Sequence, residues 1–280
     1  MGIGLGIFSV PNATEGASTL DQIVAAEHAG LDLVGVQDHP YQWRFFDTWT
    51  LLAYAAGRTE RVRFVPDVLN LPLRLPTLVA KSVASLDLLS GGRVELGLGA
   101  GAFWDGVEAM GGPRRTPKES VDALEEAVSI LRAFWSRERS ITFEGDHYRV
   151  KGAHPGPPPA HPVGIWIGAY GPRMLRVTGR LADGWLPSLG GHYLQPEDVP
   201  ARQATISEAA RAAEREPDDI ERAVNVMQLD GDPSSWADQL ARIASDLHFS
   251  TLLVGVPAED SIGFVRRLGE DVAPRVRELL

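Results

Sequence analysis

The residues of greatest chemical interest lie at the end of a short apolar run, in the stretch LDLVGVQDHPYQW from Leu31 to Trp43. The run is rich in branched side chains, which is typical of a parallel strand buried on both faces, and Pro40 stops it. Asp38 and His39 are therefore expected at the carboxyl end of a strand, where α/β folds carry their binding and catalytic groups. Histidine exchanges a proton near neutral pH. Trp43 is suited either to contact a ligand or to cap the end of the fold without one.

Both titratable groups also have a structural interpretation. His39 can be satisfied by a backbone partner, although its place beside Trp43 favours a functional role. Asp38 is expected to face the opposite way from His39, toward a structural contact or a cofactor hydroxyl. Because neighbouring strand residues diverge in this manner, the two are not expected to hold one metal ion, and we predict no metal site.

Composition restricts the class of protein. The chain has 280 residues, of which 44% are hydrophobic, so it can bury a substantial core. Its formal net charge is −10 and it has no basic run, which argues against binding nucleic acid. The absence of cysteine excludes disulfides and cysteine-ligated zinc and is weakly consistent with the cytosol. No apolar stretch approaches the roughly 20 residues of a membrane helix, so we expect a cytoplasmic protein without a membrane partner.

Strand-like and helix-like segments alternate eight times along the chain. Strands are expected at 3–10, 31–38, 62–68, 94–99, 165–169, 184–187, 222–227 and 251–256. Helices are expected at 19–30, 45–56, 78–89, 121–135, 172–181, 196–215, 236–247 and 259–279. Residues 141–150 predict a small hairpin inserted between the fourth helix and the fifth strand. This alternation predicts an α/β fold, a (β/α)₈ TIM barrel that forms one domain over residues 1–280.

In such a barrel the functional groups lie at the carboxyl ends of the strands. These ends hold Phe8, Ser9, Asp38, His39, Asp67, Val68, Ala100 to Phe103, Ala169 to Arg173, Trp185 and Ser188. The set is aromatic, rich in glycine and poor in carboxylates. It lacks the paired acids of a barrel glycosidase, and no lysine stands at a strand end for a Schiff base. A ring of this composition is suited to a flat, conjugated cofactor that supplies its own chemistry.

Two loops are suited to the polar tail of such a cofactor. Gly97–Gly101 follows a strand and lets backbone N–H groups approach an anion. It also fits a dinucleotide pattern, but Met110–Pro113 is expected to separate it from any helix, which weakens that interpretation. In the second loop, Pro172 is suited to the first turn of a helix, and the free N–H groups there, together with Arg173, predict a phosphate site. An exposed arginine at the start of a helix is the structural alternative.

Three segments together resemble one family. They are DH after the second strand, NLPLRLPTLVAKSVASLDLLSGGRVELGLGAGAF, and IWIGAYGPRMLRVTGRLADGW. Over most of residues 1–190 the chain is similar to the bacterial-luciferase-like flavin and deazaflavin oxidoreductases. The resemblance implies a luciferase-like TIM barrel that uses reduced FMN or coenzyme F420. Because DHPYQW resembles the deazaflavin members most, F420 and hydride transfer are preferred over FMN and oxygen activation.

The resemblance also implies roles for individual residues. Asp67-Val68 matches a bulge in which a non-prolyl cis peptide backs the tricyclic ring, and His39 and Trp43 match the active-site histidine and tryptophan of the deazaflavin members. The other implied roles are cofactor binding by Asp38, Ala100, Gly101, Ala169, Gly171 and Arg173, and a substrate pocket shaped by Phe8, Phe103 and Trp185. Sugar-phosphate dehydrogenases of the family carry Glu where this chain has Ala102, so their substrate is not expected here.

We therefore expect an oxidoreductase that transfers a hydride between F420 and a small, fairly apolar organic substrate. One alternative is an FMN-dependent monooxygenase that receives reduced flavin from a separate reductase. The other is a barrel that binds a ligand without catalysis. The expected partner is a small molecule, and the resemblance leaves a homodimer open.

Overall fold

A computed structural model of the chain describes residues 2–13 and 18–280. The strands are β1 (Gly4–Ser9), β2 (Leu33–Val36), β3 (Arg63–Pro66), β4 (Leu69–Asn70), β5 (Leu96–Gly99), β6 (Ile141–Glu144), β7 (Arg149–Ala153), β8 (Ile165–Ile167), β9 (Gly184–Trp185), β10 (Ser188–Leu189), β11 (Glu221–Val226) and β12 (Thr251–Gly255). The helices are α1 (Thr19–His28), α2 (Thr48–Ala56), α3 (Pro76–Ser90), α4 (Trp104–Ala109), α5 (Pro117–Trp135), α6 (Pro172–Leu181), α7 (Val199–Ala212), α8 (Pro233–Leu247), α9 (Ser261–Arg267) and α10 (Ala273–Leu279). Shorter turns are η1 (Leu71–Leu73), η2 (Pro196–Asp198) and η3 (Pro217–Asp219), and η4 (Leu268–Val272) is a π-helical turn.

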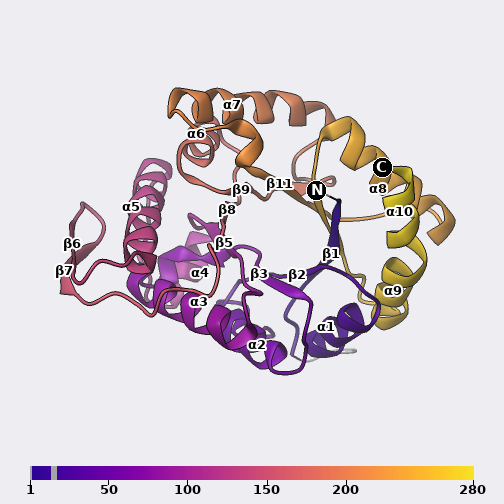
Figure 1. The fold of residues 1–280 in the computed structure, drawn as a ribbon, viewed down its shortest axis with the longest axis horizontal. Helices are drawn as coiled ribbons and strands as arrows, with labels where there is room; N and C mark the ends of the chain where they lie inside the picture. Colours follow the sequence, from indigo (N-terminus) through magenta and orange to yellow (C-terminus); the bar gives the residue numbers. More distant parts are fainter. Residues whose placement is uncertain (1, 14–17) are drawn as a thin grey trace.

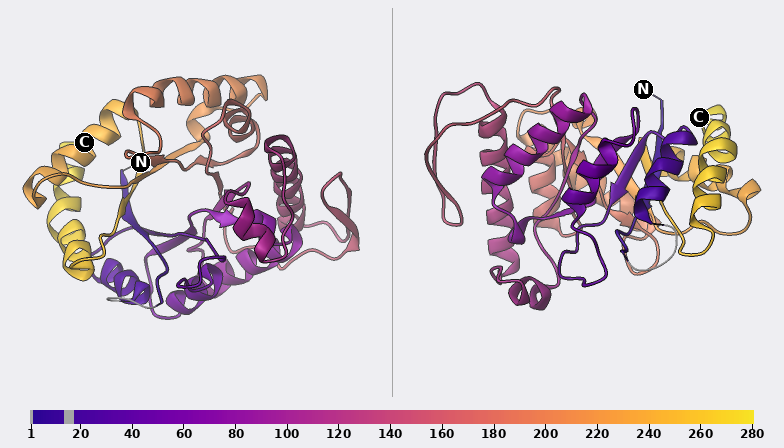
Figure 2. Two further views of the ribbon diagram at one scale, coloured as in Figure 1. Left: turned by 180° about the vertical axis from the view of Figure 1, so that it is seen from behind. Right: turned by 90° about the horizontal axis from the view of Figure 1, so that it is seen from below.

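The parallel strands form a ring inside a ring of helices (Figure 1), and Figure 2 shows the same arrangement from two further sides. Neighbouring strands follow the order β3-β2-β1-β12-β11-β9-β8-β5-β4. Phe64 of β3 closes the ring, because its N–H donates to the Arg93 carbonyl at 2.8 Å and its carbonyl accepts from the Glu95 N–H at 2.9 Å. β4 then pairs with the rest of β5, with Leu69 opposite Leu98. The predicted (β/α)₈ barrel is confirmed, with β3 and β4 sharing one position.

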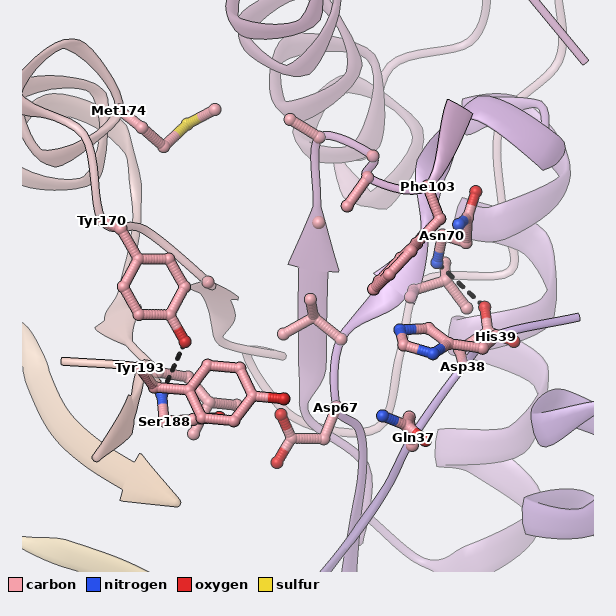
Figure 3. Close-up of a pocket in the computed structure, with 18 of the residues that line it drawn as sticks. Gln37, Asp38, His39, Asp67, Asn70, Phe103, Tyr170, Met174, Ser188 and Tyr193 are labelled. Carbon is pink, nitrogen blue, oxygen red and sulfur yellow. Dashed lines mark hydrogen bonds between the residues drawn. The ribbon is translucent and has the colours of Figure 1, made fainter. Parts of the chain in front are cut away.

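The segment between β3 and β4 departs from the continuous strand predicted over 62–68. Asp67 and Val68 form a bulge there, and the peptide bond between them is cis, as the resemblance implies. The bulge lies at the carboxyl end of the barrel. It turns the Asp67 side chain toward the space above the barrel core, where Figure 3 shows it.

The barrel interior is filled by a small apolar cluster that is separate from the larger core around it. The members of the cluster are Phe8, Leu33, Val65, Trp166, Leu186, Ala223 and Leu253. Trp166 is its largest side chain, and a Cβ on Gly184 of the adjacent strand would collide with its ring. Phe8 and Leu186 also line the cavity above, so this cluster provides the floor of the site.

Two helical segments differ from the expectation. Helix α4 begins directly after the glycine-rich loop, where no helix was expected before Pro113; only Val107 of its six residues is buried, so it leaves no periodic signal in the sequence. The helix predicted over 259–279 is divided into α9, η4 and α10. The division occurs where Gly269 lies so close to Ala29 that a Cβ would come within 2.5 Å of it.

The predicted hairpin is present as β6 and β7, and it lies outside the ring of helices beside α5 (Figure 1). The carboxylate of Glu126 on α5 anchors it by accepting from the backbone N–H groups of Asp146, His147 and Tyr148. No helix in residues 2–13 and 18–280 is both long and apolar enough to cross a lipid bilayer.

Candidate active site

A cavity of about 620 Å³ opens at the carboxyl end of the barrel. Its size is typical of sites for small molecules and cofactors. The three segments that were expected to meet all contribute to it, through His39, through Gly99 to Gly101, and through Gly171 at the start of α6. Figure 3 shows Tyr170 and Tyr193 on one wall, His39 and Phe103 on the other, and Asp67 at the base.

His39 stands in an aromatic cluster on one wall. Its ring stacks on Tyr41 at 5.4 Å between centroids and meets Phe103 edge-on at 5.3 Å. Burial lowers the pKa of His39 below its usual range, although the charge of Asp38 opposes the shift. Neither ring nitrogen of His39 is hydrogen-bonded to a residue that the structure describes. At neutral pH the ring is therefore an uncharged imidazole that can donate one proton and accept another.

Asp38 is held by hydrogen bonds within the fold, while its predicted contact with a cofactor stays a prediction. Its side chain is only 1% exposed, and its two oxygens accept from the Arg74 guanidinium at 3.0 and 3.2 Å. The backbone N–H of Asn70 adds a third bond at 2.9 Å. Asp38 touches the cavity, but its oxygens are already engaged in joining the loop that carries His39 to the segment after the bulge.

The base of the cavity carries a second carboxyl group, that of Asp67. It is 6% exposed, and its Oδ1 accepts from Asn225 Nδ2 at 3.0 Å, whereas Oδ2 is buried without a partner in the described chain. Burial raises the pKa of Asp67 to about 7, against the lowering effect of the Asn225 hydrogen bond. Asp67 therefore changes its charge near neutral pH.

The glycine-rich loop lies directly against the bulge. A Cβ on Gly99 would come within 2.7 Å of Val68 Cγ2, and a Cβ on Gly101 within 2.5 Å of Pro72 Cγ. Gly101 also has a φ of 106°, in the region that favours glycine. Beyond it, Phe103 extends over the mouth of the cavity with 64% of its surface exposed. The loop thus lines the site with backbone and small side chains.

Helix α6 points its N-terminus at the cavity. Gly171 occupies the cap position and Pro172 the first turn, and no side chain caps the helix. The side chain of Arg173 lies beside the cavity instead of lining it, because it forms an ion pair with Asp122. Lys118 also pairs with Asp122, at 2.7 Å, so two cations and one anion stand next to the helix start.

Besides Arg173, three further residues expected at the site do not line the cavity. Trp43 is 79% exposed and does not line the cavity; its ring packs against the Arg44 guanidinium instead. Trp185 is fully buried, and its Nε1 donates to the Ala169 carbonyl at 2.9 Å. The alternation of strand residues explains this, because Gly184 faces the barrel interior and its neighbour Trp185 must face the helices. Ala169 is likewise buried outside the cavity.

Several cavity residues were not expected from the sequence. They are Gln37, Asn70, His192, Tyr193 and Asn225. Asn225 could have been predicted as a site residue, because it is a polar residue within an apolar strand run. The loop residue Tyr193 follows no motif. Together with Tyr170, whose hydroxyl accepts from the Ser188 N–H at 2.8 Å, it forms the wall opposite His39 (Figure 3).

Comparison with known proteins identifies similar sequences and folds. The family model described as luciferase-like monooxygenase matches residues 5–251. An F420-dependent glucose-6-phosphate dehydrogenase from Intrasporangium calvum is 30% identical to this chain, over 93% of it and 95% of the relative.

Solved structures share the fold. An F420-dependent secondary alcohol dehydrogenase in complex with an F420-acetone adduct superposes with a TM-score of 0.82 at 20% identity, over 99% of both chains. A type II Baeyer-Villiger monooxygenase from Pseudomonas putida in complex with FMN, the oxygenating constituent of 3,6-diketocamphane monooxygenase, gives a TM-score of 0.80 at 18% identity, again over 99% of both chains. At these identities the two structures establish the architecture.

Proposed function

The chain belongs to the luciferase-like monooxygenase family, and we propose that it is an oxidoreductase in which coenzyme F420 exchanges a hydride with a small, uncharged organic substrate. The relative from Intrasporangium calvum, which is similar along almost the whole chain, supports the choice of cofactor. The observation that carries the proposal is that one cavity holds both the Asp67–Val68 bulge and the unbonded ring of His39. We further propose that residues 1–280 act as one domain in the cytoplasm.

The residues of the cavity fit a flat, polar ring system. Val68 and Phe8 provide an apolar floor, and aromatic side chains form both walls. Buried side-chain oxygens of Asp67, Asn70 and Asn225 have no partner in the part of the chain that the structure describes. Buried polar atoms are normally hydrogen-bonded, so these three oxygens are suited to a ligand that carries N–H or O–H groups.

The start of α6 would hold the phosphate of the cofactor. Free N–H groups at a helix N-terminus attract an anion, and Gly171 brings them to the rim of the cavity. Arg173 and Lys118 add two positive charges nearby, of which Asp122 balances one. The remaining positive charge favours a phosphate over a neutral group.

His39 would act as the proton-transferring residue. Its lowered pKa keeps the imidazole uncharged at neutral pH, with a free nitrogen that can take a proton from a substrate hydroxyl or return one to it. Tyr41 stacks on the ring and Phe103 meets it edge-on, so the two aromatic side chains hold the ring in place. In this role His39 moves a proton while the cofactor carries the electrons.

The cavity favours an uncharged substrate. Among the described residues that line it, none is lysine or arginine, so a substrate phosphate would lack a cationic partner. Ala102 also lines the cavity, at the position where sugar-phosphate dehydrogenases of the resembled family carry Glu. We therefore propose a substrate other than the glucose 6-phosphate of the relative, with an alcohol or carbonyl group as its reacting centre.

Binding and turnover test this proposal together. Purified protein is titrated with F420 and with FMN while the quenching of tryptophan fluorescence is followed, and turnover is then assayed on a panel of alcohols and ketones. We expect F420 to bind more tightly than FMN, and His39→Ala to abolish turnover while changing F420 affinity by less than about threefold. Binding of FMN alone would favour the monooxygenase, and binding without any turnover would favour a non-catalytic barrel.

A further inference from the structure

Asp67 and Asn225 form a polar pair across the barrel. They are 158 positions apart in the sequence and join the end of β3 to β11 through the 3.0 Å hydrogen bond described above. Both side chains are more than nine-tenths buried. Each nevertheless keeps one oxygen, Asp67 Oδ2 and Asn225 Oδ1, without a partner in the described chain. Burying two such oxygens is costly unless a ligand supplies the missing donors.

Asp67 lines the base of the cavity, and its Oδ2 is buried there beside β2. On the barrel side it faces Gly35, where a Cβ would come within 2.7 Å of it. Figure 3 shows the carboxyl at the base of the cavity, with the Tyr193 hydroxyl directed toward it from the opposite wall. Asn225 Nδ2 is also 3.4 Å from Ser188 Oγ, which helps to fix the amide. The carboxyl is thus held in place at the base of the cavity, with one oxygen that has no partner in the described chain.

We propose that Asp67, held by Asn225, binds the imide N–H on the polar edge of a flavin-type or deazaflavin ring. This inference rests on the proposed function, which puts such a ring on the bulge. The edge of these rings carries one N–H between two carbonyl groups, and an ionised carboxylate is a pure acceptor that matches the N–H. A protonated carboxyl offers a donor in place of one acceptor and suits the N–H less well. Binding therefore depends on the ionisation of Asp67.

Asp67 is the group expected to dominate that dependence. The titratable and charged groups that face it from the surrounding elements are His39 and Tyr41 after β2, the Asp38–Arg74 pair, Tyr170 after β8, and His192 and Tyr193 after β10. Burial lowers the pKa of His39 and raises those of Tyr41 and Tyr170, which moves all three away from the pKa of about 7 of Asp67. The other groups and the ligand are the same in the wild type and in an Asp67 variant, so a difference between the two proteins reports on Asp67.

The test measures the affinities of F420 and FMN by tryptophan fluorescence from about pH 5.5 to about pH 8.5 for the wild type and for Asp67→Asn. The substitution keeps the size of the side chain and removes its ionisation. We expect the wild type to bind the ring about tenfold more tightly than the variant above about pH 8, and the ratio to approach one below about pH 6. Asp146→Asn, in the exposed hairpin turn, is the matched control and should bind like the wild type throughout.

A second variant distinguishes a positioning role from mere support of the fold. Asn225→Ala removes the hydrogen bond that favours ionised Asp67, so the midpoint of the pH dependence should move to higher pH. If Asp67→Asn does not fold, this shift alone decides the inference. Equal ring affinities of wild type and Asp67→Asn at every pH, or an unmoved midpoint in Asn225→Ala, would overturn it while leaving the proposed function intact. If neither ring binds the wild type, both proposals fail.

Discussion

Arg74 clamps Asp38 with two bonds, from Nη2 to Oδ1 at 3.0 Å and from Nε to Oδ2 at 3.2 Å, directly below the loop that carries His39. The same guanidinium reaches Asp47, the cap residue of α2, at 2.7 Å. One arginine therefore connects the segment after the bulge, the His39 loop and a barrel helix. Its loss would affect both the stability of the fold and the position of His39.

Replacement of Arg74 by Met should destabilise the protein by about 2–4 kcal/mol, because it leaves the carboxylate of Asp38 buried and unpaired. Urea unfolding measures the change. The control is Arg149→Met, which removes an exposed ion pair with Glu144 and should change the free energy of unfolding by less than about 0.5 kcal/mol. Equal effects of the two variants would show that the clamp contributes nothing.

A methyl group on Gly101 should disturb the cavity. Gly101→Ala combines an unfavourable φ of 106° with a Cβ only 2.5 Å from Pro72 Cγ, so we expect a loss of at least about 2 kcal/mol and weaker ring binding. Gly111→Ala is the matched control, since its φ is also positive, at 82°, but its Cβ would meet open space. We expect the free energy of unfolding of Gly111→Ala, measured by thermal unfolding, to be about 1 kcal/mol lower than that of the wild type. A Gly101→Ala variant no worse than this control would contradict the close approach of the loop to Pro72.

Ionisation of Asp67 should oppose folding. Its pKa in the folded chain, about 7, lies above the ordinary value of 3.8, so between these values the folded state binds more protons than the unfolded state. The contribution of Asp67 to the free energy of unfolding is therefore fully present at low pH. It decreases as the pH rises toward about 7, by an amount on the order of a few kcal/mol. Asp67→Asn should therefore gain stability relative to the wild type as the pH is raised, when both are followed by denaturant unfolding. A difference that does not change with pH would contradict the raised pKa.

The charges beside α6 should tune the affinity for the cofactor phosphate. Arg173→Met should weaken F420 binding about tenfold, and Asp122→Asn should strengthen it, because it removes the charge that balances Arg173. Arg176→Met changes an exposed arginine on the same helix and serves as the control. If FMN binds, riboflavin provides a second comparison, since it lacks the phosphate and should be insensitive to Arg173. Equal changes for FMN and riboflavin would exclude a phosphate site at this helix.

The sequence predicts those parts of the site that local rules determine. The position of His39 at the cavity could be predicted because an apolar run ends just before it. The barrel could be predicted from the alternation of strand and helix signals. The cis bulge at Asp67–Val68 could be expected only from the resemblance, since no propensity marks it. The prediction that Trp185 lines the substrate pocket is wrong. Its strand has two residues, and so short a run does not indicate which of them faces the barrel interior.

The polar base of the site depends on pairing across the barrel. Asn225 meets Asp67 only when the ring closes, so neither residue indicates the other in the sequence. The same holds for Asp38, whose partner Arg74 lies 36 positions away. In both cases the sequence shows the carboxyl group but not its hydrogen-bonding partner. The partner decides whether the carboxyl has a structural role or is free to bind a ligand.

The most direct test of the central claim is a comparison of the two cofactors in one assay. Wild-type protein and His39→Ala are incubated with oxidised F420 and a panel of uncharged alcohols, and with reduced F420 and the corresponding ketones, while the visible absorbance of oxidised F420 is followed. A parallel assay with reduced FMN follows oxygen consumption. We predict substrate-dependent absorbance change with F420 that His39→Ala abolishes, without substrate-dependent oxygen consumption with FMN. Oxygenation of a substrate with FMN, and no reaction with F420, would contradict the account.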